Sequence, residues 1–378
     1  MKFSFSAEQA EFRSNLRRFL ADRSPTKEVR RLMETDMGWE RDDWRRANEA
    51  LGLTALRIPE AYGGAGFGFS EVGIVLEEMG RALFCAPYFA TAVLATGAIL
   101  NAGTDAQKQA LLPDIALGET IATLAAAEDN GRWEGVATTL LATPSASGHR
   151  LDGHKSFVLD GHTADTIVVL ARAPGSTGEN GLSFLTVRGN ASGLSRQLLK
   201  TMDPTRKLAR LTFNGVEAEP LGQPGAAAGP FARTMIEASV CLANEMVGGA
   251  ERLREDALAY SKLRMQFGRQ IASFQSMKHK AADMLLDVEL AKSAAYYAAA
   301  ALDDGDADVA ATASLAKACA SDAYVQTAVH AIQIHGGIGF TWDNDTHLWF
   351  KRAKSSEVLF GDASYHREQM MRHWGAAA

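Results

Sequence analysis

The chain has 378 residues, of which 47% are hydrophobic and 22% are charged, and its formal net charge is −6 at pH 7. This length exceeds one ordinary hydrophobic core and predicts two or three packed subdomains. The acidic balance argues against a broad nucleic-acid-binding face. The sequence contains no run of about 18 consecutive apolar residues, the length expected of a membrane span.

The cysteine pattern indicates a reducing environment. Three cysteines, Cys85, Cys241 and Cys319, lie far apart, and none forms a CxxC pair. Such a pattern favours buried thiols and predicts neither a disulfide framework nor a metal site. The first residues lack the apolar run of a signal peptide, and their acidic side chains are unlike a transit peptide. We therefore expect a cytoplasmic protein.

Residues 1–118 are predicted to form a helical domain. Ser6 is a candidate N-cap for a first helix whose apolar residues recur at steps of three and four. The glycine-rich string PEAYGGAGFG, at residues 59–68, leads into a further helix. Two more helical patterns are separated at Gly103 and Thr104. The apolar positions of the first helix are Phe12, Leu16, Phe19 and Leu20.

Residues 119–224 are predicted to form a β domain of six to eight strands, inserted between helical ones. Asp152-Gly153 has the composition of a hairpin turn, and Asp160-Gly161 closes the strand that follows it. The clearest strands are the β-branched and apolar runs at 166–172, 182–189 and 209–216.

Residues 225–378 are predicted to form a four-helix bundle with short connections. A linker is expected at 225–229, after which the helical patterns become long. The second long pattern has an apolar stripe that contains Met277, Ala281, Met284, Leu285, Val288, Ala291 and Ala295. The expected helices span 232–266, 275–304, 307–335, 344–359 and, as a short last one, 364–374.

Two C-terminal motifs carry a family resemblance. YSKLRMQFGRQIASFQ, at 260–275, and QIHGGIGFT, at 333–341, closely resemble signatures of the acyl-CoA dehydrogenase family, FAD enzymes that desaturate acyl-CoA thioesters between the α and β carbons. PEAYGG and GTDAQK…LLP resemble the same family's N-terminal helical domain. The resemblance implies an α+β multidomain fold with an N-terminal all-α domain, a central β-barrel or sandwich domain and a C-terminal four-helix bundle.

The resemblance also implies which residues contact FAD from a neighbouring subunit. An arginine can hydrogen-bond the pyrophosphate with both arms of its guanidinium. A plainer interpretation makes these motifs only a last helical turn and a helix connection, with the glycine pair as a C-cap. The implied cofactor residues are Arg264, Gln266, Phe267, Gln275, Gln333, Gly336 and Gly337.

The middle domain departs from the family pattern. AAAEDNGRW, at 125–133, stands where the family usually has a Thr-Glu-Pro loop beside the flavin. Phe157 takes the place of a tryptophan that often stacks on the isoalloxazine, and Leu159 that of a threonine that often bonds flavin N5. Phe157 can still stack, or it is an ordinary core residue. Leu159 cannot donate a hydrogen bond.

The usual catalytic base is missing. Phe360 stands where many family members carry the glutamate that removes the α proton. Some members place the carboxylate on the preceding long helix, at a position that matches Ala238 here, beside Glu237. Glu237 and Glu245 are therefore the substitute candidates, with Asp362 a lesser one. His279 and His335 receive no catalytic role, because a histidine near a helix end more often packs or caps.

Several assemblies are compatible with this pattern. The chain is interpreted as an FAD-dependent acyl-CoA dehydrogenase subunit that passes electrons to an acceptor such as a flavoprotein. It forms either a homotetramer with a relocated base or an α₂β₂ heterotetramer in which it is the base-lacking subunit. Two alternatives remain: a flavin-dependent monooxygenase or oxidase of the same fold, and a stabilising subunit that binds no flavin.

Overall fold

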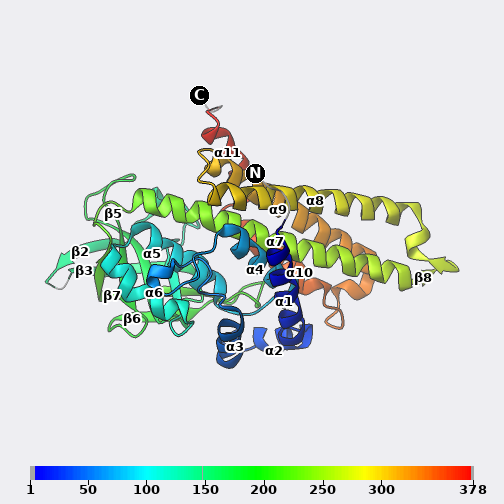
Figure 1. Cartoon of the computed structure of the whole chain (residues 1–378), viewed down its shortest axis with the longest axis horizontal. Coiled ribbons are helices and arrows are strands. Elements are labelled where there is room, and N and C mark those ends of the chain that lie inside the picture. The colour runs from blue at the N-terminus through cyan, green and yellow to red at the C-terminus, as the bar shows by residue number, and fades with distance from the viewer. Residues whose placement is uncertain (1–4, 147, 376–378) are drawn as a thin grey trace. The chain divides into compact units, whose positions relative to one another are not determined.

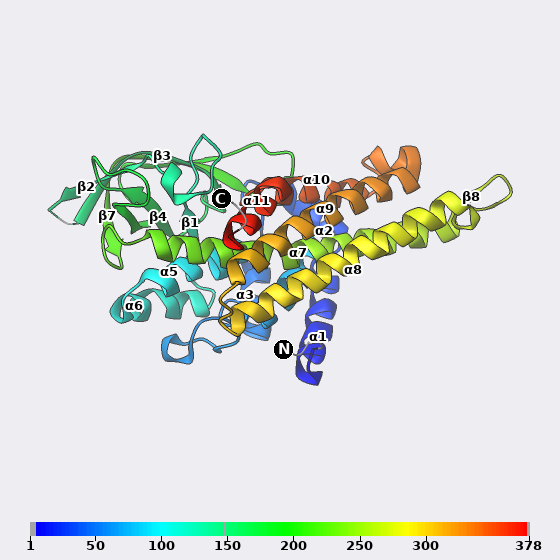
Figure 2. The same cartoon turned by 90° about the horizontal axis from the view of Figure 1, so that it is seen from above.

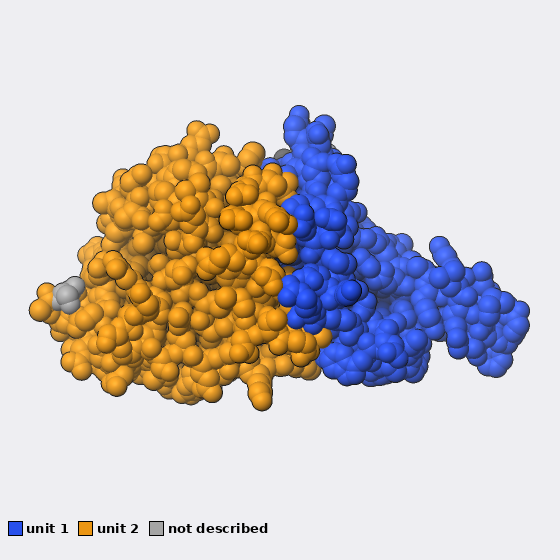
Figure 3. Space-filling view, turned by 90° about the horizontal axis from the view of Figure 1, so that it is seen from below, with its two compact units in different colours: residues 1–31, 69–84, 239–378 blue, residues 32–68, 85–238 orange. Residues whose placement is uncertain are grey.

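The computed structural model describes residues 5–146 and 148–375, which form two compact units (Figure 3). Unit 1 contains residues 1–31, 69–84 and 239–378, and unit 2 contains residues 32–68 and 85–238. Each unit thus combines segments that are distant in the chain. The predicted boundaries at 118 and 224 separate kinds of secondary structure rather than compact units, and as domain boundaries they stay predictions.

Unit 1 consists of long helices packed along one another (Figure 1). Helix α9 contacts α8, α10 and α11, while α4 packs against both α1 and α8. This arrangement confirms the predicted C-terminal helical bundle and adds two N-terminal helices to it. The bounds are Ala7–Arg23 for α1, Phe69–Ala82 for α4, Gln275–Asp303 for α8, Val309–His335 for α9, Thr346–Val358 for α10 and Ala363–His373 for α11. Helices α2 (Thr26–Met33) and α7 (Ala228–Leu263) extend across the boundary between the units.

The predicted cap of α1 is present. Ser6 and Gln9 form a reciprocal capping box, and Leu16 and Leu20 are buried as the spacing predicts. The helix is held to its neighbours by a buried polar contact. Arg13 Nη2 lies 2.8 Å from Glu77 Oε2 on α4, and the Tyr296 hydroxyl on α8 donates to the same oxygen at 2.7 Å.

Helices α4 and α7 approach closely through two glycines. A Cβ at Gly248 would lie 1.8 Å from the carbonyl oxygen of Glu77, and one at Gly80 would lie 2.0 Å from that of Glu245. Any side chain at either position would force the two backbones apart. These glycines therefore fix the crossing of α4 and α7.

The apolar stripe on α8 is buried only in part. Met284, Val288, Ala291 and Ala295 are buried, whereas Leu285 is 45% exposed. Leu285 belongs to the predicted apolar stripe but not to its buried part. The ~100° turn per residue places it beside Met284 but on the outer side of the helix.

Unit 2 is built around a seven-stranded sheet that closes on itself. Strand β4 pairs with both β5 and β2, and the path β2-β3-β7-β5 joins the two. The ring confirms the predicted β domain and selects a barrel over a two-sheet sandwich. The strands are β1 Ala122–Ala125, β2 Leu141–Ser145, β3 Gly148–Leu159, β4 Thr166–Arg172, β5 Leu182–Arg188, β6 Leu194–Leu198 and β7 Leu208–Leu221.

The predicted hairpin turn at Asp152-Gly153 is wrong. Strand β3 continues through both residues, and the β2–β3 ladder ends instead at the pair Ser145 and Gly148. The register of β3 against β7 shifts at Asp152, and Gly153 has a φ of +136°. Both residues stay paired with β7, and the β-bulge lies opposite them: Gly215 is the extra residue of β7 between Asn214 and Val216, and its amide donates to Asp152 Oδ1 at 2.8 Å. The predicted end of this strand at Asp160-Gly161 is confirmed.

Short helices complete unit 2. The predicted break at Gly103 and Thr104 is present between α5 and α6. The predicted linker at 225–229 is shorter than expected, since α7 begins at Ala228. The remaining bounds are α3 Arg41–Leu51, the 3₁₀ turns Glu60–Tyr62 and Gly135–Ala137, the π-helix Phe89–Ala95, α5 Thr96–Ala102 and α6 Asp105–Ala116.

Candidate cofactor and catalytic sites

A short exposed hairpin between α7 and α8 carries the first motif (Figure 2). Strands β8 (Met265–Gln266) and β9 (Arg269–Gln270) pair with each other, and Gly268, with φ +76°, makes the turn. Phe267 also has a positive φ, +52°, and is 90% exposed. Leu263 and Met265 beside it are also exposed, and an exposed apolar patch of this kind marks an interaction site.

The hairpin presents an unpaired cation. The Arg264 side chain is exposed and makes no ion pair or hydrogen bond within residues 5–146 and 148–375. Its backbone is nevertheless fixed, because Arg264 N donates to Tyr260 O at 2.9 Å and Ile271 N donates to Arg264 O at 2.9 Å. A rigid backbone with a free guanidinium suits recognition of an anion supplied from outside the chain.

The second motif lies at the end of α9, next to the start of α8. Lys280 Nζ on α8 donates to Gln333 Oε1 on α9 at 3.0 Å. The Tyr260 and His335 rings stack at 4.3 Å, which ties the end of α7 to the end of α9. Gln275 begins α8, and its amide contacts His279 at 3.2 Å. Unit 1 therefore brings both motifs to the same end of its bundle.

The two glycines of the second motif differ in what the fold requires. Gly336 has a φ of +66°, so its backbone favours glycine. Gly337 has no positive φ, and a Cβ there would meet no atom within 4 Å. The described chain itself gives no reason for glycine at 337, which points to close approach by a group outside the chain.

We expect Gly337→Ala to leave the unfolding temperature of the apoprotein unchanged while weakening FAD binding. Gly336→Ala is the matched control, because a side chain in that backbone region costs about 1–3 kcal/mol of stability. Thermal unfolding and FAD titration measure the two effects. Unchanged FAD affinity in a folded Gly337→Ala protein would contradict this role for the glycine.

Phe157 belongs to unit 2 and lies in an irregular part of β3. The register against β7 shifts between Lys155 and Val158, and Phe157 has a φ of +58° and is 38% exposed. The interpretation of Phe157 as an ordinary core residue is therefore wrong. The strained backbone directs a phenyl ring outward, as a stacking role requires.

Polar contacts fasten the loop after β1 to this irregular segment. Lys155 is fully buried, and its Nζ donates to Ala126 O and Glu128 Oε1, each at 2.8 Å. Burial lowers the pKa of Lys155 to about 8, against the opposing attraction of Glu128. Ser156 donates to Asp129 Oδ1 at 2.5 Å. Sequence patterns alone did not identify Lys155 as a structural residue, because it stands there only as a lysine among strand residues.

Glu128 accepts further hydrogen bonds from the start of β2. The amides of Thr139 and Leu140 donate to it at 2.9 Å. Burial alone would raise its pKa, but Lys155 and these donors outweigh burial, so the pKa lies below its usual range. Leu159 is buried, and its side chain offers no donor, as expected.

Phe360 is buried in the loop between α10 and α11. It is 3% exposed, with a φ of +62°. Lys317 on α9 donates to the carbonyl oxygens of Glu357 at 3.2 Å and Gly361 at 3.0 Å. His366 Nε2 donates to Phe360 O at 3.2 Å. Burial, then Lys317, lowers the pKa of His366 to about 3, so the ring stays neutral.

The two candidate bases are engaged in buried ion pairs. Glu237 accepts from Arg57 at 2.7 Å and from Arg233 at 3.0 Å. Glu245 accepts from Arg352 at 2.7 Å, and both of these side chains are under 10% exposed. A carboxylate paired in this way is oriented by its arginine, which is a structural task.

The remaining titratable candidates also have structural partners. Asp362 caps α11 by accepting from Tyr365 N at 2.8 Å. His335 Nδ1 donates to Ala331 O at 2.8 Å within its own helix. None of these contacts supports a catalytic function.

No described helix, over residues 5–146 and 148–375, has the length and hydropathy needed to cross a bilayer.

Comparison with known proteins places this fold and these motifs in one family. The profile for the N-terminal domain of acyl-CoA dehydrogenases matches residues 6–119, and that for the C-terminal domain matches residues 232–375. The acyl-CoA dehydrogenase IpdE2 of Mycobacterium tuberculosis is 35% identical over 332 residues, which cover 88% of this chain and 86% of that protein.

Two solved structures match nearly the whole chain. The Tcur3481-Tcur3483 steroid ACAD G363A variant is 30% identical with a TM-score of 0.87, over 98% of this chain and 99% of that one. Butyryl-CoA dehydrogenase from Megasphaera elsdenii is 25% identical with a TM-score of 0.91, over 100% and 99%. The chain belongs to the acyl-CoA dehydrogenase family. Members are FAD-dependent oxidoreductases that act on CH–CH groups.

Proposed function

We propose that this chain is the base-lacking subunit of a heteromeric acyl-CoA dehydrogenase, and that it completes the FAD site of a neighbouring subunit. One observation carries the proposal. Phe360, which cannot accept a proton, stands by the family resemblance at the usual base position and is buried, while the exposed hairpin keeps Arg264 and Phe267 free for an outside partner. The chain thus retains the residues that would contact the FAD of a neighbouring subunit, and it lacks the base that its own active site would need.

The residues present suit the dinucleotide. Arg264 supplies a free guanidinium for the pyrophosphate, Phe267 an apolar face for the adenosine half, and Gly337 room for close approach. From unit 2, Phe157 offers a ring to the isoalloxazine. When bound, FAD accepts the hydride that leaves the β carbon of the thioester. The full proposed set is Arg264, Gln266, Phe267, Gln275, Gln333, Gly336, Gly337 and Phe157.

The base position is held in place although it carries no base. Lys317 donates to the carbonyl oxygens of Glu357 and Gly361, and His366 donates to that of Phe360. These hydrogen bonds hold the loop backbone, so a neighbouring side chain cannot readily move into the position of Phe360. Glu237 and Glu245 remain hypothetical substitutes, but each would first have to leave its arginine. Breaking a buried ion pair typically costs about 3–5 kcal/mol.

A relative supports the heteromeric assembly and a bulky substrate. The structure named for Tcur3481-Tcur3483 is called a steroid ACAD, and it is 30% identical to this chain. We accordingly propose a large, ring-bearing acyl-CoA as substrate and an electron-transfer flavoprotein as acceptor. The free cysteines suit the cytoplasm as the compartment.

Co-purification tests the proposal. The chain is produced alone and together with its genomic neighbour, and FAD per subunit and acyl-CoA-dependent dye reduction are measured for each. We expect activity only from the joint preparation. Full activity of the chain alone would instead indicate a homotetramer with a relocated base, and a colourless joint preparation would indicate a stabilising subunit.

Arg264→Ala is expected to lower FAD affinity by roughly tenfold to a hundredfold. The reason is the loss of a charged hydrogen bond to the pyrophosphate, worth about 1.5–3 kcal/mol. Lys262→Ala, which removes an exposed cation from the end of α7, is the matched control. FAD titration of the intact assembly measures both, and equal affinities for the two variants would reject the assignment.

A further inference from the structure

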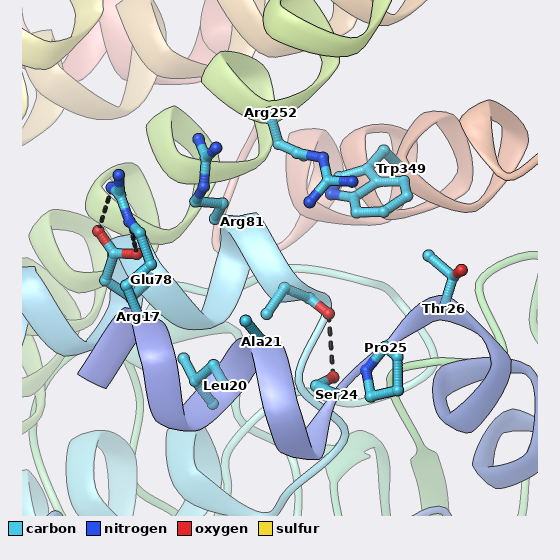
Figure 4. Close-up of a pocket in the computed structure, with 11 residues that line it drawn as sticks. Arg17, Leu20, Ala21, Ser24, Pro25, Thr26, Glu78, Arg81, Arg252 and Trp349 are labelled. Atoms are coloured by element: carbon cyan, nitrogen blue, oxygen red, sulfur yellow. Dashed lines mark hydrogen bonds and ion pairs between the residues drawn. The ribbon is translucent and has the colours of Figure 1, made fainter. Parts of the chain in front are cut away.

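Unit 1 contains a polar cavity whose lining shares no residue with the proposed FAD set. Its volume is about 320 Å³, and it lies among α1, α2, α4, α7 and α10 (Figure 4). Pockets for small molecules begin at about 300 Å³, so the cavity can hold a compact ligand. Its lining includes three arginines and one carboxylate: Arg17, Arg81, Arg252 and Glu78.

The negative charge of the Glu78 carboxylate is already balanced by an arginine. Glu78 accepts two hydrogen bonds from Arg17, from Nε at 2.8 Å and from Nη2 at 2.6 Å, as the dashed lines in Figure 4 show. Glu78 is 1% exposed, so this bidentate pair is part of the wall. The lining cations whose carboxylate partners lie outside the cavity are Arg81 and Arg252.

Each of these two arginines keeps donors in reserve. Arg252 uses only Nε, toward Asp256 at 2.7 Å, and its Nη groups have no hydrogen-bond partner among residues 5–146 and 148–375. Arg81 uses Nη2 toward Glu255 and likewise leaves Nε and Nη1 without a described partner. The carboxylates of Glu255 and Asp256 are about two-fifths exposed and do not line the cavity.

A buried donor in the wall also lacks an acceptor. Trp349 is 2% exposed, and its indole Nε1 has no hydrogen-bond partner in the described chain. Leaving a buried donor unsatisfied costs about 1–3 kcal/mol, and such groups usually have a partner. The Arg252 guanidinium lies over the same ring, 5.4 Å from its centroid, as Figure 4 shows.

The start of α2 adds backbone N–H donors, which carry partial positive charge. Glu28 N and Val29 N both donate to Pro25 O, so the amides of Thr26 and Lys27 precede the first intrahelical hydrogen bonds. Thr26 lines the cavity, at the positive end of the helix dipole. The polar groups without partners, on Arg81, on Arg252, at Trp349 Nε1 and at the first amides of α2, are thus all donors, and such a set selects for an anion.

We propose that this cavity is a binding site for a small phosphorylated metabolite, with Arg81, Arg252, Trp349 Nε1 and the first amides of α2 holding the phosphoryl group. A tetrahedral anion accepts from several directions at once, as two guanidinium groups and a helix start require. Leu20, Ala21 and Pro25 form an apolar wall of the cavity, which would contact the carbon-bearing part of the metabolite. The site is independent of the proposed FAD residues and of Phe360.

Calorimetric titration of the FAD-loaded assembly tests the site, with inorganic phosphate and glycerol 3-phosphate as probes and chloride at matched ionic strength as the blank. We expect saturable binding that weakens about tenfold or more in Arg252→Gln and in Arg81→Gln. Arg372→Gln, which breaks an exposed ion pair on α11, should bind normally, and FAD content should stay unchanged in all variants.

The two probes distinguish the sources of the phosphoryl group. Tighter binding of glycerol 3-phosphate supports an organic phosphate, as proposed, whereas equal binding assigns the site to free phosphate and overturns the metabolite. Absence of saturable binding, or binding undiminished in Arg252→Gln, overturns the site itself. If Arg81→Gln does not fold, Trp349→Phe replaces it, since it removes only the indole donor and should still weaken binding several-fold.

Discussion

Phe360→Glu is expected to raise acyl-CoA dehydrogenation by this subunit substantially. The unmodified chain should be very poor with straight-chain acyl-CoA, because a positioned general base contributes about 10²–10⁴-fold in rate and Phe360 supplies none. The Lys317 ammonium, which donates to the carbonyls of Glu357 and Gly361, favours an ionised carboxylate at 360 despite its burial. Dye reduction with FAD-loaded protein measures the gain.

Three further variants make this result specific. In Phe360→Gln the new side chain has nearly the shape of glutamate but cannot act as a base, so this variant should stay inactive. Glu237→Gln and Glu245→Gln locate any substitute base. Robust activity of the unmodified homo-oligomer that one of them abolishes, with FAD retained, would reject the silent-subunit proposal and name the base. Activity that survives both would reject both candidates as well.

Lys155→Met is expected to destabilise unit 2 by about 3–5 kcal/mol. The change leaves Glu128 as a buried carboxylate without its counter-ion, and the loss of one partner from a buried pair carries a cost of this size. Denaturant unfolding, followed by tryptophan fluorescence, measures it. The loop at 126–129 should also become more accessible to protease, because Lys155 Nζ no longer holds Ala126 O.

A double variant separates the pair from the packing around it. Lys155→Met with Glu128→Gln should recover part of the lost stability, since no charge is then buried. The surface pair of Arg132 and Glu134 is the control, and Arg132→Met should change stability by less than about 1 kcal/mol. A Lys155→Met protein as stable as that control would contradict the account.

The same lysine makes stability depend on pH in a definite direction. Its pKa is about 8 in the folded chain and 10.5 when unfolded, so between these values the unfolded state binds more protons. The contribution of Lys155 to the free energy of unfolding therefore rises with pH across this window. Glu128 acts at acid pH, where its lowered pKa makes stability fall as pH falls. Lys155→Met should remove the alkaline rise.

Local sequence patterns predicted the elements of this fold well. Helix α8 begins at Gln275 and α9 ends at His335, as expected, because caps and apolar periodicity are written in adjacent residues. Asp152-Gly153 misled because the dipeptide favours a turn but also fits within a strand opposite a β-bulge, here at Gly215 of β7, and only the distant partner strands decide between the two. The joining of α1 and α4 to the C-terminal helices likewise depends on contacts far apart in the chain.

The candidate site was predictable where it forms a continuous motif. Arg264 and Phe267 stand in one short string, and the structure places them on one exposed hairpin. The partners of Glu237 and Glu245 could not be predicted in this way. Arg57 is 180 residues from Glu237, and Arg352 is 107 residues from Glu245. Ion pairing of this kind follows from packing, which no local spacing reveals.

The most direct test of the central claim is an anaerobic titration of the FAD-loaded chain with acyl-CoA, followed by the visible absorption of the flavin. We expect the isolated chain, once loaded with FAD, to keep its oxidised flavin spectrum after acyl-CoA is added, because no base removes the α proton. The same titration of the complex with its partner subunit should bleach the flavin. Rapid bleaching by the isolated chain would contradict the claim that it lacks a functional base.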